Sequence, residues 1–111
     1  MTIIVKQFIL THDQYNLVNS PEGSEFRLEY FDIGMGNVSK KMYDQYKVVA
    51  EVDSNNLTET FELMNVWNQP EKITVLNPHH SLSVGDILVK DNVEYVVDNI
   101  GFKKLEFTND Q

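Results

Sequence analysis

The residues best suited to chemistry gather in one short segment, His79-His80-Ser81-Leu82-Ser83-Val84-Gly85-Asp86. It contains two imidazoles, two hydroxyls and a carboxylate. Imidazoles and carboxylates bind Zn²⁺ and similar divalent ions, so His79 and His80 are candidate metal ligands. A complete site would draw further ligands from His12 and from a carboxylate such as Asp13 or Asp86. The alternative is a turn in which His80 hydrogen-bonds to the backbone, and this needs no metal.

The same segment lacks the features of a serine hydrolase. A serine nucleophile requires a base within hydrogen-bonding reach and an oxyanion hole, and a histidine next to a serine in sequence supplies neither. Ser81 and Ser83 are better explained as partners of turn backbone groups, with Gly85 at a positive φ and Asp86 capping the bend. We therefore expect no catalytic residue, no enzymatic activity and no required cofactor, with a divalent metal as the alternative.

The composition of the chain limits where it works and what it binds. Its 111 residues suit one domain, 1–111, and contain no cysteine, which excludes disulfides and thiolate metal ligands. A reducing compartment fits this composition. The N-terminus shows no basic region before a long apolar run, and no stretch is long enough to cross a bilayer. These features predict a cytoplasmic protein.

The net charge indicates the kind of partner. Asp and Glu number 17 against 9 Lys and Arg, which gives a net charge of −8. Binding to a phosphate backbone needs clustered Lys and Arg, and Arg27 is the single arginine, so we expect no direct nucleic-acid binding. The acidity either serves solubility or attracts a basic protein, such as a nuclease whose nucleic-acid cleft the chain would occupy.

The acidity is concentrated between Val48 and Glu71, where no Lys or Arg occurs. The candidate partner-binding residues are the carboxylates of this segment: Glu51, Asp53, Glu59, Glu62 and Glu71. A solvated helix face is the alternative. We expect the chain itself to be a monomer or a small homo-oligomer.

The candidate residues must be positioned by strands and one helix. Apolar alternation predicts extended segments over 3–10, 26–31, 46–52, 73–76, 87–89, 95–97 and 103–107, with a hairpin turn at Asp91-Asn92. Asn56 is the predicted cap of a helix whose capping-box residue is Glu59. Leu57, Phe61 and Met64 share one face of that helix.

These elements predict an α+β domain, a mainly antiparallel, curled sheet of about five strands with one amphipathic helix packed on it. Its C-terminal hairpin is the organising unit, and residues 108–111 are expected to fray. The predicted core comprises Val48, Ala50, Leu57, Phe61, Met64, Leu82, Ile87, Val89, Val96 and Phe102.

Four pieces of the chain resemble the YodL-like domain family. They are Tyr46-Lys47-Val48-Val49, the segment from Leu57 to Asn68 with Pro70, His80-Ser81-Leu82-Ser83-Val84-Gly85-Asp86-Ile87, and Tyr95-Val96-Val97-Asp98-Asn99-Ile100-Gly101-Phe102. The resemblance covers about residues 44–105. It departs from the family pattern at three positions, where His79 replaces Gly, Gly85 replaces Ser and Trp67 replaces Phe.

The YodL-like family occurs in phages, plasmids and other mobile genetic elements, and the resemblance supplies no catalytic residue. Mobile elements carry many small acidic proteins that disable host nucleases, including restriction enzymes and CRISPR effectors. By this analogy the resemblance implies an anti-CRISPR or anti-restriction inhibitor acting by protein–protein interaction. The alternative is a non-inhibitory accessory or regulatory module that binds a small ligand, a metal or further copies of itself.

Overall fold

The computed structural model describes residues 1–107, and these form six strands, four α-helices and two 3₁₀ helices. The strands are β1 (Thr2–Gln7), β2 (Lys47–Asp53), β3 (Ile73–Val75), β4 (Ile87–Lys90), β5 (Val93–Val97) and β6 (Phe102–Lys104). The helices are α1 (His12–Val18), α2 (Ser24–Ile33), α3 (Lys40–Tyr43) and α4 (Leu57–Val66), with the 3₁₀ helices η1 (Pro21–Gly23) and η2 (Pro70–Lys72). The α+β class is confirmed, with six strands where about five were expected and with several helices where one was expected.

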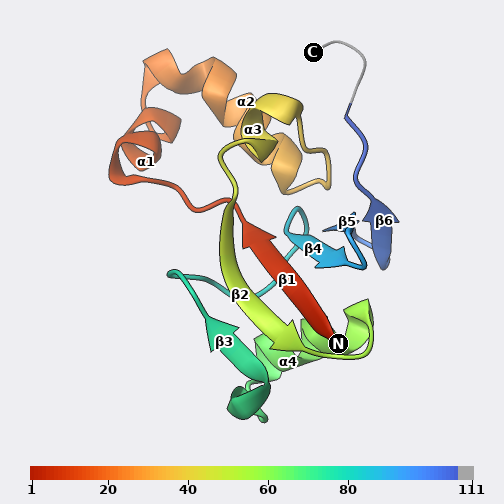
Figure 1. The fold of residues 1–111 in the computed structure, drawn as a ribbon. Coiled ribbons are helices and arrows are strands. Elements are labelled where there is room, and N and C mark those ends of the chain that lie inside the picture. The colour runs from red at the N-terminus through yellow and green to blue at the C-terminus, as the bar shows by residue number, and fades with distance from the viewer. Residues whose placement is uncertain (108–111) are drawn as a thin grey trace.

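The six strands form one antiparallel sheet in the order β3-β2-β1-β4-β5-β6 (Figure 1). β1 lies between the two halves of the sheet, and Val5 pairs with Ala50 on one side and Leu88 on the other. The predicted C-terminal hairpin therefore joins the sheet through the first strand of the chain. Its turn residues Asp91 and Asn92 have φ values of 53° and 65°, the geometry of a type I′ hairpin, which confirms the predicted turn.

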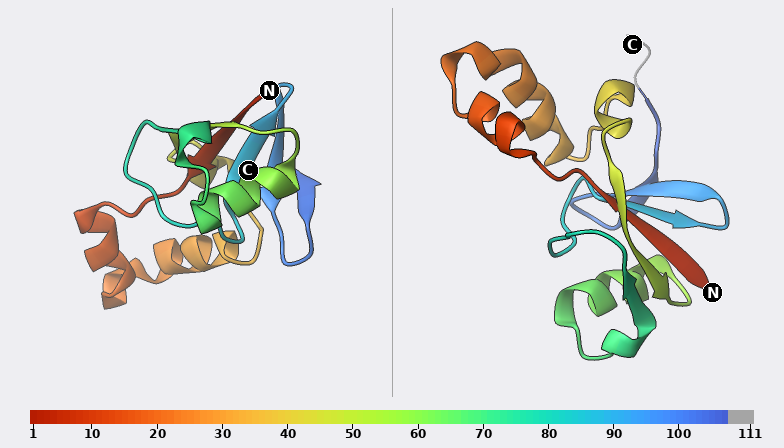
Figure 2. Two further views of the ribbon diagram at one scale, coloured as in Figure 1. Left: turned by 90° about the horizontal axis from the view of Figure 1, so that it is seen from below. Right: turned by 60° about the vertical axis from the view of Figure 1, so that its left-hand side comes forward.

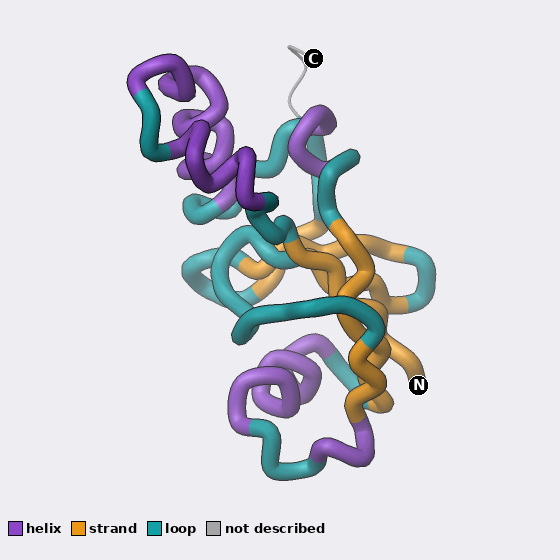
Figure 3. Tube along the Cα trace, turned by 90° about the vertical axis from the view of Figure 1, so that its left-hand side faces the viewer, coloured by secondary structure: helices purple, strands orange, loops and turns teal. Residues whose placement is uncertain are grey.

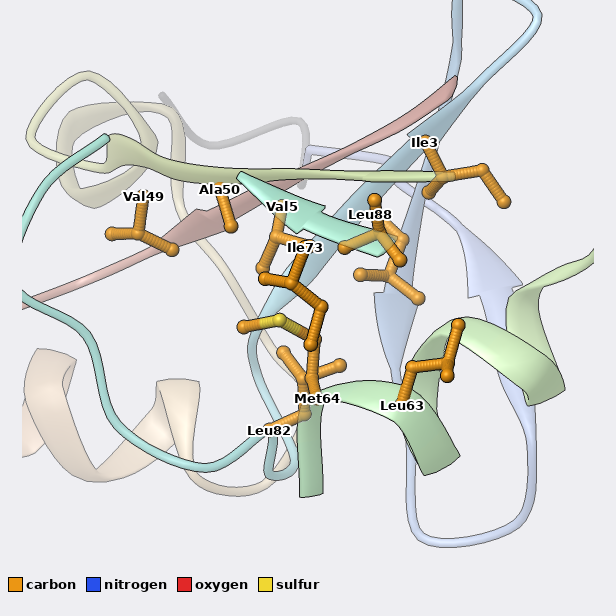
Figure 4. Packing of buried hydrophobic residues seen from close by; sticks show 10 residues of the cluster. Ile3, Val5, Val49, Ala50, Leu63, Met64, Ile73, Leu82 and Leu88 are labelled. Carbon is orange, nitrogen blue, oxygen red and sulfur yellow. The ribbon is translucent and has the colours of Figure 1, made fainter. Parts of the chain in front are cut away.

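The two faces of the sheet support separate hydrophobic clusters. Ile87 and Leu88 are adjacent on β4 and fully buried, and they enter different clusters because successive side chains of a strand point to opposite faces. Leu88 packs in the cluster that contains Leu63 and Met64 of α4 (Figure 4). Ile87 packs in the cluster that contains Ile33 of α2. Helices α1–α3 lie at one end of the molecule, and α4 with η2 lies at the other (Figures 2 and 3).

Helix α4 confirms the helix prediction and its cap. The Asn56 side-chain oxygen accepts a hydrogen bond from the Glu59 backbone N–H at 2.7 Å. The Glu59 carboxylate accepts from the Asn55 N–H at 3.0 Å, one residue before the position a capping box would use. Met64 is fully buried, while Leu57 and Phe61 pack on the same cluster from its edge. Of the predicted core, Ala50, Met64, Leu82, Ile87 and Val96 are buried, whereas Val48, Leu57, Phe61, Val89 and Phe102 are half-buried.

The prediction of an extended segment over 26–31 is wrong, because these residues belong to helix α2. Helix α1, which begins at His12, was not predicted. Thr11 caps α1 in a full capping box with Gln14. β1 ends at Gln7, and β6 ends at Lys104, so both are shorter than predicted. The expected fraying of 108–111 lies outside the described residues. No helix within residues 1–107 has the length and apolarity needed to cross a bilayer.

Candidate functional site

The His79–Asp86 segment is fastened to the end of β1 by Gln7. The Gln7 side chain is completely buried, and its Nε2 donates to the His80 carbonyl at 2.9 Å and to Oδ2 of Asp86 at 3.2 Å. Its Oε1 accepts from the His80 backbone N–H at 3.1 Å. One amide thus satisfies three polar groups of a segment that has no regular secondary structure, which removes the cost of burying them unpaired.

Asp86 closes the bend at the end of this segment. Its Oδ2 accepts from the Ser83 N–H at 2.9 Å, and its own N–H donates to the Ser83 carbonyl at 3.1 Å. Gly85 has a φ of 97°, and a Cβ there would lie 2.2 Å from the Ile33 carbonyl oxygen. The predicted roles of Asp86 and Gly85 in the turn are therefore confirmed, and Gly85 is also required by its contact with α2.

Burial governs the electrostatics of Asp86, whose side chain is 6% exposed. Burial raises the pKa of Asp86 to about 6, against the opposing effects of the Ser83 N–H, the charge of His80 and the Gln7 amide. Tyr46 donates to the Gly85 carbonyl at 2.5 Å. Burial and the charge of Asp86 raise the pKa of Tyr46, so the phenol keeps the proton that it donates.

A pocket of about 360 Å³ opens beside Asp86, between the C-terminal part of α2 and this segment. We call it the Asp86 pocket. Its lining includes Phe8, Tyr30, Phe31, Met35, His80 and Asp86. Aromatic and thioether groups thus face the pocket together with one carboxylate, and no lysine or arginine among residues 1–107 lines it. Such an arrangement can hold an apolar group that carries a cation or a hydrogen-bond donor.

The two candidate metal ligands have different partners. The His79 ring stacks on Trp67 with centroids 5.3 Å apart, and its Nδ1 is buried without a hydrogen-bond partner in the described part of the chain. The Nδ1 of His80 lies 2.8 Å from the Ser81 carbonyl oxygen and 3.2 Å from Nε2 of Gln7. His12 begins α1 and contacts Asn16.

Among residues 1–107 no group of three or more His, Asp or Glu side chains is arranged to hold a metal ion. Metal binding therefore remains a prediction, which metal analysis of the purified protein would test, and the described residues contain no site for it. No hydrogen bond joins the hydroxyl of Ser81 or Ser83 to an imidazole in that same part of the chain.

The five candidate partner-binding carboxylates lie at one end of the molecule but on two surfaces. Ala50 and Val52 of β2 face the cluster beneath α4, so Glu51 between them points to the opposite face of the sheet. Asp53 shares the orientation of Glu51 and lies 3.4 Å from the N-terminal amino group of Met1.

The other three carboxylates lie on α4 and η2. Glu59 and Glu62 are one turn apart on α4, and Glu71 is exposed on η2, which follows at the same end (Figure 1). Glu62 and Glu71 accept no hydrogen bond from the described residues, whereas Glu59 caps its helix. We call Glu59, Glu62 and Glu71 the acidic end.

The lysines that form ion pairs do so elsewhere. Within residues 1–107 the lysine ion pairs are Lys6–Glu94, Lys40–Asp44, Lys41–Glu29 and Lys103–Asp98. The Arg27 guanidinium donates to backbone carbonyls near the end of α1. In this part of the chain, none of the carboxylates at the acidic end lies within ion-pairing distance of a lysine or arginine.

A half-buried cluster of polar side chains joins α3 to the sheet. The Lys6 ammonium lies 2.8 Å from Glu94 and 2.9 Å from the Tyr43 hydroxyl, which donates to Glu94 at 2.6 Å. Burial lowers the pKa of Lys6, but the hydrogen bonds and charges of Glu94 and Tyr43 outweigh this and raise it. Burial raises the pKa of Glu94, but Lys6 and Tyr43 outweigh this and lower it. All three groups are satisfied by one another, which favours a structural role.

Sequence reasoning missed Gln7 and the α2 residues of the Asp86 pocket. A signal for Gln7 was present, because Ile3, Val5 and Gln7 alternate on one face of β1 and a glutamine at an inward position needs buried partners. Phe31 and Met35 gave no such signal, because the segment was assigned to the wrong kind of element.

Comparison with known proteins places the chain by its sequence. The model of a family described as "YodL-like domain" matches residues 15–107. No curated protein matches the chain. No solved structure matches it either.

Proposed function

The chain belongs to the YodL-like domain family, and from this premise we propose that it is an inhibitory interaction protein. It binds a basic, nucleic-acid-handling defence protein of the host in the cytoplasm, a CRISPR effector or a restriction enzyme. The proposed contact surface is the acidic end, flanked by Glu51 and Asp53 on β2. The protein acts by occupying its partner and carries out no reaction of its own.

The absence of lysine or arginine partners at the acidic end, within residues 1–107, supports this proposal most directly. A carboxylate already held by a lysine contributes little further attraction, whereas unpaired carboxylates add their fields and attract a basic surface. Glu62 and Glu71 are also exposed and accept no hydrogen bond from these residues, so a partner can reach them without breaking a contact.

The class of partner follows from charge complementarity. A protein that binds a nucleic-acid backbone presents clustered Lys and Arg in its cleft. This protein has a net charge of −8, with 9 Lys and Arg against 17 Asp and Glu. Its charge is therefore complementary to that of such a cleft, and the protein is suited to occupy it. Binding there excludes the nucleic acid, and this exclusion is the inhibition that we propose.

The proposal is tested by affinity capture and by nuclease assays. Immobilised protein is exposed to host lysate and to a panel of purified restriction enzymes and CRISPR effectors, and nuclease activity is measured with rising salt. The variant Glu62→Lys/Glu71→Lys changes the net charge from −8 to −4 at the acidic end. It leaves Glu59 in place, because Glu59 caps α4.

The matched control is Glu22→Lys/Glu106→Lys, which makes the same change of net charge at two exposed residues away from the acidic end. The proposal predicts that the acidic-end variant loses binding and inhibition at least about tenfold, while the control retains most of both. Failure to bind any nucleic-acid-handling protein, or equal loss in the two variants, would contradict it.

The Asp86 pocket and exposed apolar residues on α2 favour a second candidate function. Leu28, Phe31 and Met35 are 67%, 54% and 63% exposed. A non-inhibitory accessory module that binds a ligand or assembles with its own copies would use such groups. Elution of the purified protein as a stable oligomer would favour assembly, and elution as a monomer at all concentrations would exclude it.

A further inference from the structure

Helix α2 carries apolar side chains on two opposite faces. Phe26 and Ile33 pack toward the sheet, in and against the cluster that contains Ile87. Leu28, Phe31 and Met35 project from the other side, and more than half of each is exposed. They are spaced by three and four positions, so they form one stripe along the helix and its C-terminal turn. We call them the α2 stripe.

The α2 stripe leads into the Asp86 pocket. Phe31 and Met35 belong to both, while Leu28 extends the stripe outward along the helix. The stripe from Leu28 to Met35 is about 10 Å long at a rise of about 1.5 Å per residue. A small molecule held in the pocket would leave the outer part of the stripe exposed to water, whereas a peptide segment would cover both.

The carboxylate in the pocket has one oxygen without a partner. Oδ2 of Asp86 accepts from Gln7 and Ser83, but no group in residues 1–107 donates a hydrogen bond to Oδ1. Asp86 lines the pocket, although the residue as a whole is 4% exposed. A carboxylate that lines a pocket to which no lysine or arginine of residues 1–107 contributes favours a cationic partner.

We propose that the Asp86 pocket and the α2 stripe together bind a protein segment that inserts one arginine or lysine. Its ammonium or guanidinium group donates to Oδ1 of Asp86, and its alkyl stem lies among Phe31, Met35 and Tyr30. Neighbouring apolar side chains of the segment cover Leu28. This site is separate from the acidic end, and it goes beyond the proposed function.

The aromatic surroundings and the local charge both suit this occupant. Arginine and lysine bury their alkyl stems against apolar surface and place their charge over aromatic rings. Among the described residues that line the pocket, Asp86 is the one carboxylate, and none is a lysine or an arginine. A wholly apolar segment would leave Oδ1 unpaired, and an acidic segment would be repelled.

The test uses a displayed library of random peptides, selected on the whole protein. We expect the enriched peptides to share an arginine or lysine next to apolar residues, and to shift the backbone NMR signals of residues at the pocket. Replacing that basic residue by citrulline or by norleucine in a synthetic peptide should weaken binding at least about tenfold, about 1.4 kcal/mol. Enriched peptides without a basic residue would overturn the proposal.

Variants of the protein give the second arm. Asp86→Asn should weaken binding of the selected peptides at least about tenfold, and Asp44→Asn, at an exposed carboxylate on another surface, should not. Phe31→Ser removes an exposed ring and so leaves the core intact, and it too should weaken binding, whereas Ile100→Ser at another exposed apolar residue should not. If Asp86→Asn does not fold, Phe31→Ser decides alone. Equal binding by Phe31→Ser and wild type would contradict the proposal.

A third arm separates a peptide from a free organic cation. n-Butylguanidinium is added alone and the same NMR signals are followed. We expect it to bind at least about tenfold more weakly than the selected peptides, because it leaves the stripe uncovered. Binding of equal strength would show that the site recognises a small cation and would overturn the peptide proposal. None of these measurements uses the acidic end, so their failure leaves the proposed function standing, and the reverse also holds.

Discussion

Gln7 and Asp86 are hydrogen-bonded, with Nε2 of Gln7 3.2 Å from Oδ2 of Asp86, although 79 residues separate them in the chain. This contact joins the last residue of β1 to the residue that immediately precedes β4. The same amide also binds both backbone groups of His80. The His79–Asp86 segment, which lies within the family match at 15–107, is therefore held in place by a residue outside that match.

Replacement of Gln7 by leucine should destabilise the protein by about 2–4 kcal/mol, because it leaves the polar groups of His80 and Asp86 buried without their partner. Urea unfolding measures the loss. Gln69→Leu is the control, since Gln69 makes no side-chain cap hydrogen bond at the start of η2. A change below about 0.5 kcal/mol for Gln7→Leu would show that the segment does not depend on this amide.

Gly85→Ser should unfold the protein or destabilise it by more than about 3 kcal/mol. The positive φ costs a side chain about 1 kcal/mol, and the new Cβ would overlap the Ile33 carbonyl. Gly101→Ser is the matched control. Gly101 has a φ of 76° but no atom within 4 Å of an added Cβ, so it reports the backbone cost alone. Similar thermal midpoints for the two variants would contradict the close contact with α2.

The raised pKa of Asp86 makes stability depend on pH. The folded-state value of about 6 lies above the ordinary value of 3.8, so the folded protein binds the proton more tightly than the unfolded chain. This contribution is present in full below about pH 4 and is lost as the pH rises through about 6. Relative to Asp86→Asn, the wild type should lose up to about 3 kcal/mol between these limits.

Chemical unfolding of both proteins at a series of pH values measures this difference, in which titrations common to the two chains cancel. The charged or titratable groups near Asp86 are His80 and Tyr46, and both are retained in the variant. A stability difference that does not change with pH would show that the Asp86 carboxylate is ionised as easily in the folded protein as in water. A change in the opposite direction would show that it is ionised more easily, and either result would contradict the prediction.

Glu94→Gln should destabilise the protein by about 1–2 kcal/mol at neutral pH, because it removes the charge that pairs with Lys6. Since the folded-state pKa of Glu94 is lowered, its contribution is present above the ordinary value of 4.5 and is lost as the pH falls below it. Tyr43→Phe removes the hydroxyl that bridges the pair. A double-mutant cycle of these two changes should give a coupling above about 0.5 kcal/mol, and additivity would contradict a shared network.

The strands of the sheet and helix α4 were predictable because local signals agreed with the final packing. Asn56 offered a cap, and the apolar side chains of α4 follow a helical period on one face. Helix α2 was not predictable in this way. Phe26 and Tyr30 pack inward, while Leu28 and Phe31 point outward. Because Leu28 lies between the two inward residues, every second residue from 26 to 30 is apolar, which is the pattern of a strand. Periodicity rules assume that the apolar residues of a helix face the core, so they cannot predict a helix that also has an exposed apolar face.

The candidate site likewise has one part that the sequence predicts and one part that it does not. The turn at Gly85 and Asp86 was predictable, because glycine and aspartate satisfy the local backbone. The clamp by Gln7 and the pocket beside Asp86 were not, since both arise from contacts between β1, α2 and the late segment that only the fold creates. The carboxylates of the acidic end were identified from the sequence composition alone. That Glu51 and Asp53 lie on a different surface follows from the alternation of side chains between the two faces of β2, which only the structure shows.

The most direct test of the central proposal is the association rate between this protein and the nucleic-acid-handling protein that it captures, measured as salt rises from about 50 mM to about 300 mM. The account predicts a fast rate that falls at least about tenfold over this range, and a slower, flatter response for Glu62→Lys/Glu71→Lys than for Glu22→Lys/Glu106→Lys. A rate indifferent to salt, and equal in the two variants, would show that the acidic end is a solvated surface and not the contact.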